Sequence, residues 1–180
     1  MLPHPQRKPT RLREYDYSQS GWYFITVCIK NRMEWFGDVV NEKMVLNAYG
    51  KIAREQWLWL ARQYDYVKLD EFIIMPNHMH GIVVIENDVI RRDNPRVVPT
   101  VVPTNIHNRR YNLLSKSANA FKTTSSKLIH QNCLIEFIWQ RSFYDHIIRD
   151  EESLGSIREY IINNPMKWDL DRNNPENLFM

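Results

Sequence analysis

Two of the six histidines stand two residues apart in the segment MPNHMHGIVVIEN, residues 75–87. If this segment is a strand, His78 and His80 point to one face and Met79 points away, with a rise of about 7 Å between the two histidines. Two imidazoles on one face can converge on one divalent ion. A lone His-x-His pair is more often a packed or surface feature, so the metal interpretation needs further ligands.

A predicted helix near the end of the chain supplies two more candidates. Asp150 can cap its start, and Pro165 limits its end because the residue before a proline avoids helical geometry. Tyr160 and Asn164 are four residues apart on this helix, so their side chains are neighbours on one face. Taken singly, the tyrosine is most simply a core or rim aromatic and the asparagine a helix cap.

Together, these four residues suit chemistry at a phosphate. Two imidazoles and an amide oxygen with open positions suit Mg²⁺ or Mn²⁺, whereas Zn²⁺ would bind the histidines tightly but is not required. The ion would act as a Lewis acid. Tyr160 could attack phosphorus to form a covalent ester, and its phenolic pKa near 10 means that it needs charge stabilisation from the ion or a base. A tyrosine beside an ion held by His78, His80 and Asn164 is thus a chemically sensible nucleophile.

Hydrophobic periodicity predicts the elements that must position these side chains. An uninterrupted aromatic and β-branched run predicts a central strand, and apolar residues spaced by three or four predict helices. The elements are strand 21–29, helix 44–64, strands 66–75 and 78–86 joined as a hairpin, helix 113–131, strand 133–140 and helix 150–164. For 133–140, a helix stays open as an alternative because the run is short.

This order predicts an α+β fold, a ferredoxin-like sandwich. We expect an antiparallel sheet of four to five strands with helices on one face, and an additional C-terminal helix that carries the tyrosine. Residues 87–112, with three prolines and a tandem VVPTVVPT, fit no regular element and predict a flexible surface insertion.

Length and composition favour one domain over residues 1–180. The sequence has no apolar run of about 18 residues and no signal-peptide pattern at its start, so we expect a cytoplasmic protein. Cys28 and Cys133 stand singly in apolar stretches, which predicts two buried thiols and neither a disulfide framework nor a thiolate zinc site.

The net charge of +3 permits a polyanionic partner without requiring one. A basic N-terminal arm, within residues 1–20, includes Arg11 and Arg13 in the run RKPTRLR. Lys116, Lys122 and Lys127 lie off the apolar stripe of the helix over 113–131 and give it a basic outer face. Solvated surface is an equally simple explanation for both groups.

Several motifs resemble those of one family. HMH on a strand, EYIINNP on a late helix, FYDHIIRD between them and RLREYDYSQSGWYFITVCIKNR at the front are similar to the REP-associated tyrosine transposases. These are relatives of the single-tyrosine HUH transposases of the insertion-sequence 200 type. The resemblance covers nearly all of the chain outside residues 87–112.

The resemblance implies a DNA-nicking and strand-transfer enzyme. By that similarity, His78, His80 and Asn164 bind the metal, and Tyr160 cuts single-stranded DNA that carries hairpins, leaving a 5′-phosphotyrosine link and a free 3′-hydroxyl. It makes the basic arm and the helix lysines candidates for contacts with the DNA backbone, and adds His146 and Arg149, which could instead support the site. A monomer and a homodimer both stay open.

Two other functions compete with this one. A domesticated module could bind hairpin DNA without cutting it, although the intact set of four residues speaks against that. A metal-dependent hydrolase of small phosphoesters would need an acidic base beside the ion, for which Asp70 and Glu71 are the candidates on the preceding strand.

Overall fold

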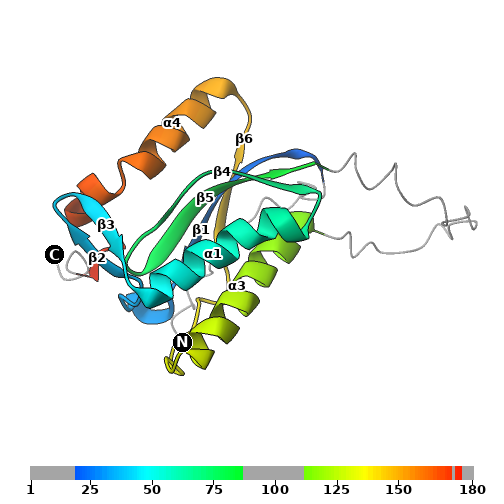
Figure 1. Cartoon of the computed structure of the whole chain (residues 1–180). Coiled ribbons are helices and arrows are strands. Elements are labelled where there is room, and N and C mark those ends of the chain that lie inside the picture. Colours follow the sequence, from blue (N-terminus) through cyan, green and yellow to red (C-terminus); the bar gives the residue numbers. More distant parts are fainter. Residues whose placement is uncertain (1–18, 87–111, 172, 176–180) are drawn as a thin grey trace, which may run out of the picture.

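The centre of the fold is an antiparallel sheet of four strands in the order β4-β5-β1-β6. The computed structural model describes residues 19–86, 112–171 and 173–175. Helices α1 and α3 cover one face of the sheet and α4 lies on the other (Figure 1). The elements are β1 (Gly21–Cys28), η1 (Lys30–Arg32), β2 (Gly37–Val40), β3 (Lys43–Leu46), α1 (Ala48–Gln63), β4 (Val67–Ile74), β5 (His78–Ile85), α3 (Leu113–Gln131), β6 (Tyr144–Ile148), α4 (Glu151–Ile162) and η2 (Pro165–Leu170).

Strand β1 lies inside the sheet, as its aromatic and β-branched composition predicts. It pairs with β5 along its whole length, from Gly21 opposite Ile85 to Cys28 opposite His78. Its other edge pairs with β6. The four strands and their two covering helices give the α+β, ferredoxin-like arrangement that the sequence predicts, and α4 is the additional helix.

Asparagine side chains begin both covering helices. Asn47 Oδ1 accepts hydrogen bonds from the backbone N–H of Tyr49 and Gly50, and Asn112 Oδ1 accepts one from Ser115. This satisfies backbone donors that a helix start leaves without partners. The apolar stripes of both helices then pack on the sheet; their buried members include Ala53, Trp57, Leu60, Leu114, Ala118 and Phe121.

The predicted helix over 44–64 begins too early. Residues up to Leu46 instead form β3, which pairs with β2 in a two-stranded hairpin that the sequence analysis missed. The two residues of its turn, Asn41 and Glu42, both have positive φ, 50° and 59°. Such a turn suits a tight hairpin, but Asn-Glu is not the Asn-Gly pair that would have signalled it.

The predicted strand over 133–140 is also wrong. This segment is irregular apart from one bridge between Ile29 and Trp139. Its buried residues, Phe137 and Trp139 among them, are apolar because they pack beneath α3. The strand that completes the sheet is β6, in a segment that the sequence analysis did not assign. Cys133 is exposed with a φ of 71°, so the prediction of a buried thiol fails there, whereas Cys28 is buried.

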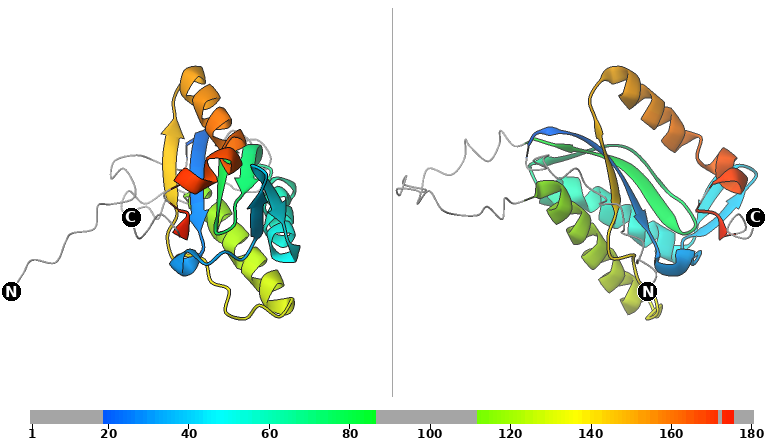
Figure 2. Two further views of the ribbon diagram at one scale, coloured as in Figure 1. Left: turned by 90° about the vertical axis from the view of Figure 1, so that its left-hand side faces the viewer. Right: turned by 180° about the vertical axis from the view of Figure 1, so that it is seen from behind.

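Helix α4 packs on the second face of the sheet through a small apolar cluster of Ile82, Ile148, Leu154 and Ile161. Asp150 caps the helix, as predicted, by accepting a hydrogen bond from the Ser153 N–H at 2.7 Å. The left view in Figure 2 shows β6 at one edge of the sheet, and α4 beginning above the end of that strand. Within the described residues, no helix has both the length and the apolar character needed to span a membrane.

Candidate active site

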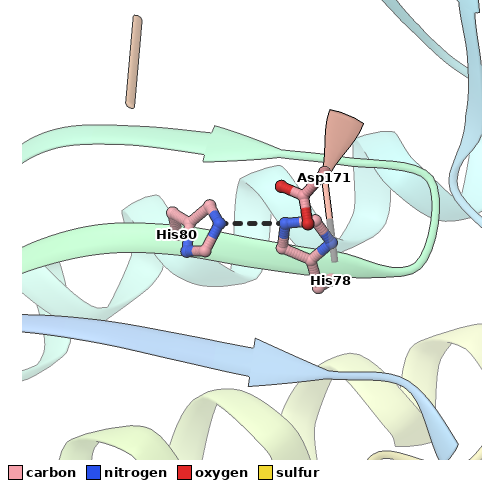
Figure 3. A group of neighbouring side chains, drawn as sticks. All are labelled: His78, His80 and Asp171. Atoms are coloured by element: carbon pink, nitrogen blue, oxygen red, sulfur yellow. Dashed lines mark hydrogen bonds between the residues drawn. The ribbon is translucent and has the colours of Figure 1, made fainter. Parts of the chain in front are cut away.

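The two histidines of β5 form the centre of the site. Both side chains are buried, and their Nε2 atoms lie 3.0 Å apart (Figure 3). They face the same side of the sheet as α4, as the alternation along a strand predicts. Two imidazole nitrogens this close need either a proton or a cation between them, because two lone pairs at that distance repel each other.

Asn77 fixes the tautomer of His78. The Asn77 Nδ2 donates to the carbonyls of Arg32 at 3.1 Å and Asn173 at 2.7 Å. Because carbonyls only accept, the orientation of this buried amide is determined, and its Oδ1 must face His78 Nδ1 at 2.9 Å. His78 Nδ1 therefore carries the hydrogen and donates it to Asn77. The Nε2 lone pair of the neutral ring then points at His80.

His80 is held from β1. Its Nδ1 lies 2.8 Å from the Thr26 hydroxyl, on the residue directly opposite in the sheet. The Phe24 ring stacks on the imidazole with a centroid distance of 5.3 Å. Since a hydroxyl can donate or accept, His80 can present either an N–H or a lone pair at Nε2. A metal ligand needs the lone pair, with Nδ1–H donating to Thr26.

Tyr160 meets this pair from α4. Its hydroxyl lies 3.2 Å from His80 Nε2, and its ring makes an edge contact with Phe24. The side chain of Tyr160 is 39% exposed, whereas the two histidines are at most 1% exposed. A large substrate can therefore reach the phenol, whereas the two imidazoles lie buried beneath the tyrosine side chain.

Asn164 contributes a buried oxygen. Within the described residues, no hydrogen-bond donor reaches its Oδ1, and its Nδ2 donates to Asp171 Oδ2 at 3.3 Å. Asn164 has helical backbone angles, φ −59° and ψ −41°, although it precedes Pro165, so the expected avoidance of helical geometry before a proline does not hold here. A buried amide oxygen without a partner costs about 1–3 kcal/mol. A cation ligated by that oxygen would remove the penalty.

Asp171 is a site residue that the sequence analysis missed. One of its carboxylate oxygens and one ring nitrogen of each histidine all lie within 4.8 Å of one another (Figure 3). Its Oδ1 accepts a hydrogen bond from the Asn173 N–H. Its position depends on η2, which turns the chain back over β5 and stacks Trp168 on His78. Only the acidic residue type signalled it, and several acids near the end of the chain share that signal.

This donor set fits a divalent ion. The observed Nε2–Nε2 separation of 3.0 Å matches two neighbouring ligands of an octahedral ion, each about 2.1 Å from it. Both Nδ1 atoms have partners that hold the rings in place, which is typical of metal-binding histidines. Imidazole nitrogens with carboxylate and amide oxygens suit ions such as Mn²⁺, Mg²⁺ and Zn²⁺.

Asp70 lies outside this group. It forms a two-pronged ion pair with Arg158, with Nε–Oδ1 and Nη2–Oδ2 distances both of 2.7 Å. Hydrogen bonds from Arg158 hold the pKa of the Asp70 carboxyl below its usual range. The pair joins β4 to α4 two residues before Tyr160, so it positions the helix. The nearest candidate for an acid beside an ion is Asp171, not Asp70.

The predicted DNA-binding residues are scattered. Arg11 and Arg13 lie outside the described residues. Lys116, Lys122 and Lys127 are on α3, across the sheet from Tyr160. Lys122 donates to the carbonyls of Gln140 and Arg141, and burial lowers the pKa of its ammonium. Lys116 lies over the Tyr64 ring, and Lys127 is exposed.

His146 lies on the face of the sheet that carries the candidate site. His146 is exposed on β6, directly opposite Phe24 in the sheet, and Arg149 is exposed just after the strand. The structure thus brings together His78, His80, Asn164 and Tyr160, with His146 beside them. The lysines of α3 form a separate group.

No protein-family model matches the chain. A Haemophilus influenzae protein described as "Uncharacterized protein" is 37% identical over 168 residues, 92% of each chain. A second protein of that organism, "Putative REP-associated tyrosine transposase", is 26% identical over 154 residues, 84% of this chain and 74% of that protein. The solved structure "Structure of the REP associates tyrosine transposase bound to a REP hairpin" is 21% identical, with a TM-score of 0.55, and covers 87% of this chain and 73% of that one.

Proposed function

Because the chain belongs to the family of the REP-associated tyrosine transposases, we propose that it is a metal-dependent endonuclease and strand transferase. Its substrate is single-stranded DNA that carries hairpins, encountered in the cytoplasm. The observation that carries this proposal is the 3.2 Å distance between the Tyr160 hydroxyl and His80 Nε2. That distance supports Tyr160 as a nucleophile beside the atoms that would bind a divalent ion.

His78, His80 and Asn164 would hold Mg²⁺ or Mn²⁺, with Asp171 beside them as a further ligand or as the acceptor that orients the Asn164 amide. The ion, when bound, supplies Lewis-acid polarisation of a phosphate oxygen. Asn77 keeps His78 in the tautomer that ligation needs, and the Thr26 hydroxyl can accept from His80 Nδ1–H, which allows the same tautomer there. The chain also leaves the Tyr160 hydroxyl accessible to a strand of DNA.

Tyr160 carries the covalent step. Its oxygen bonds to the scissile phosphorus while the bond from phosphorus to the 3′-oxygen breaks. The proton that the phenol loses is matched by the one that the departing oxygen gains, leaving a 5′-phosphotyrosine and a 3′-hydroxyl. A second 3′-hydroxyl can reverse the reaction, so strands are joined without ATP or water.

The partner we propose is hairpin DNA of the repetitive palindromic kind. The solved relative was bound to a REP hairpin. Part of the affinity would come from cations on DNA phosphates, and Arg149, exposed between β6 and α4, is one candidate among those described. Arg11 and Arg13 stay candidates from the sequence alone.

The test uses hairpin oligonucleotides with randomised single-stranded flanks, Mn²⁺ and a denaturing gel. We expect a protein–DNA adduct that disappears in Tyr160→Phe, while that variant still binds the hairpin. Binding by the wild-type chain without an adduct would favour the non-cutting module. Cleavage that survives Tyr160→Phe would favour a hydrolase that uses Asp171.

A further inference from the structure

Helix α4 packs mainly on β4 and contacts β6 at Ile148; within the described residues it leaves exposed the strip of β6 that carries Tyr144 and His146. α4 packs on β4, and within the described residues the extensive contacts of β6 are with β1. β6 is the edge strand (Figure 2). The uncovered strip starts at the side of the candidate active site.

Aromatic rings line this strip. In the antiparallel register, Tyr144 lies opposite Thr26 and His146 opposite Phe24. Residues opposite each other share a face. Phe24 and Ile148 pack toward α4, and Ile147, which lies between His146 and Ile148, packs toward α1 and α3. By alternation, Tyr144 and His146 therefore share the α4 face.

Both rings are exposed to solvent. Tyr144 is 51% exposed and His146 is also exposed, while Phe24 is half-buried between them and the catalytic centre. Edge strands of natural sheets are commonly protected by charged side chains, especially lysine. The chain instead presents two rings there.

We propose that Tyr144, His146 and Phe24 form a stacking platform for the unpaired nucleobases next to the scissile phosphate. This inference rests on the proposed action on single-stranded DNA, and adds where the strand lies and what grips it. Base–aromatic stacking tolerates any sequence because every base has a flat face. Such a platform would hold the strand while the hairpin supplies recognition.

Two observations identify the occupant as single-stranded nucleic acid. The platform is continuous with the site, since Phe24 stacks on His80 and contacts Tyr160, and Tyr144 lies opposite Thr26, which contacts His80. Exposed arginines, Arg141 and Arg149, flank the two ends of β6. This arrangement of aromatic rings between two arginines suits single-stranded DNA whose bases stack on the rings and whose phosphates lie near the arginines.

The test measures binding in a Tyr160→Phe background, where no covalent step interferes. The probe is the hairpin oligonucleotide with a single 2-aminopurine in the flank next to the cleavage position; the fluorescence of this base falls when it stacks. With Tyr144 and His146 intact in this background, we expect binding to decrease the 2-aminopurine fluorescence. Tyr144→Ala with His146→Ala should restore the fluorescence and weaken binding about fivefold or more for each ring lost.

Two controls separate stacking from other effects. Tyr144→Phe with His146→Phe keeps the rings and should keep both quenching and affinity. Tyr49→Ala, a ring on α1 across the sheet, should change neither. The loss in the alanine variant should be similar at low and high salt, because stacking releases no counterions.

Equal affinity and quenching in the alanine and parent proteins would overturn the platform. A loss as large in the phenylalanine variant would also overturn it, since the rings would then not matter. Failure of the proposed function looks different: the parent chain would bind no hairpin, or the chain with Tyr160 would form no adduct.

Discussion

Asn77 Oδ1 accepts a hydrogen bond from His78 Nδ1 at 2.9 Å, and this contact aims the other ring nitrogen at His80. Asn77→Ala removes the acceptor while leaving both imidazoles in place. Loss of such a partner typically costs about 10–100-fold in metal affinity. We expect Mn²⁺ titration calorimetry to show a decrease in that range. Unchanged affinity in a folded variant would contradict the orienting role.

Asn164→Leu tests the buried amide oxygen that has no partner among the described residues. Leucine has a similar volume and removes both the unsatisfied oxygen and the hydrogen bond from Nδ2 to Asp171; these two effects oppose each other, so the metal-free stability should change by no more than about 1 kcal/mol. The rise in melting temperature on adding Mn²⁺ should shrink, because the ion loses a ligand. Thermal unfolding with and without Mn²⁺ measures both. An undiminished rise would exclude Asn164 as a ligand.

His80→Ala should abolish cleavage and leave hairpin binding largely intact. The ion stabilises the charge that develops in the transition state more than it contributes to the affinity for the uncleaved DNA. Adduct formation and binding of the same oligonucleotide, measured in parallel, separate the two effects. Equal loss of both would refute this division.

Asp70→Asn breaks the ion pair with Arg158 that ties α4 to β4. The folded pKa of Asp70 lies below its unfolded value, so the pair contributes stability above a pH of about 4 and loses it as the pH falls. The variant should therefore melt a few degrees lower than wild type at neutral pH, with a gap that narrows below about pH 4. A difference in melting temperature that does not depend on pH would show that the ion pair does not contribute to stability.

Lys122→Ala should lower stability rather than DNA affinity. Its ammonium donates to the Gln140 and Arg141 carbonyls and holds the chain that leads into β6. Removing these bonds should cost about 1–3 kcal/mol in urea unfolding. Lys127→Ala, an exposed lysine on the same helix, is the matched control and should leave stability unchanged. If Lys122→Ala weakened DNA binding but left stability unchanged, the result would contradict the structural role and support a contact between Lys122 and a DNA phosphate.

Local patterns predicted the parts of the site that depend on one element. The shared face of His78 and His80 follows from strand alternation, whereas Asn164 lies two residues beyond the end of α4, so helical spacing from Tyr160 does not by itself place it. The β6 strand and the β2–β3 hairpin escaped prediction because short segments give little periodicity, while 133–140 resembled a strand through its apolar packing. Asp171, Asn77 and Thr26 escaped because their roles arise from contacts across the sheet and from η2, which no spacing in the sequence encodes.

In the proposed reaction, the Tyr160 oxygen becomes bonded to the scissile phosphorus. The most direct measurement is peptide mass spectrometry after incubation with hairpin DNA and Mn²⁺, followed by nuclease trimming of the bound strand. We expect the peptide containing Tyr160 to gain the mass of a 5′-linked nucleotide, and the matching DNA fragment to end in a 3′-hydroxyl. Cleaved DNA with no modified peptide, or a nucleotide attached to another residue such as Tyr144, would contradict it.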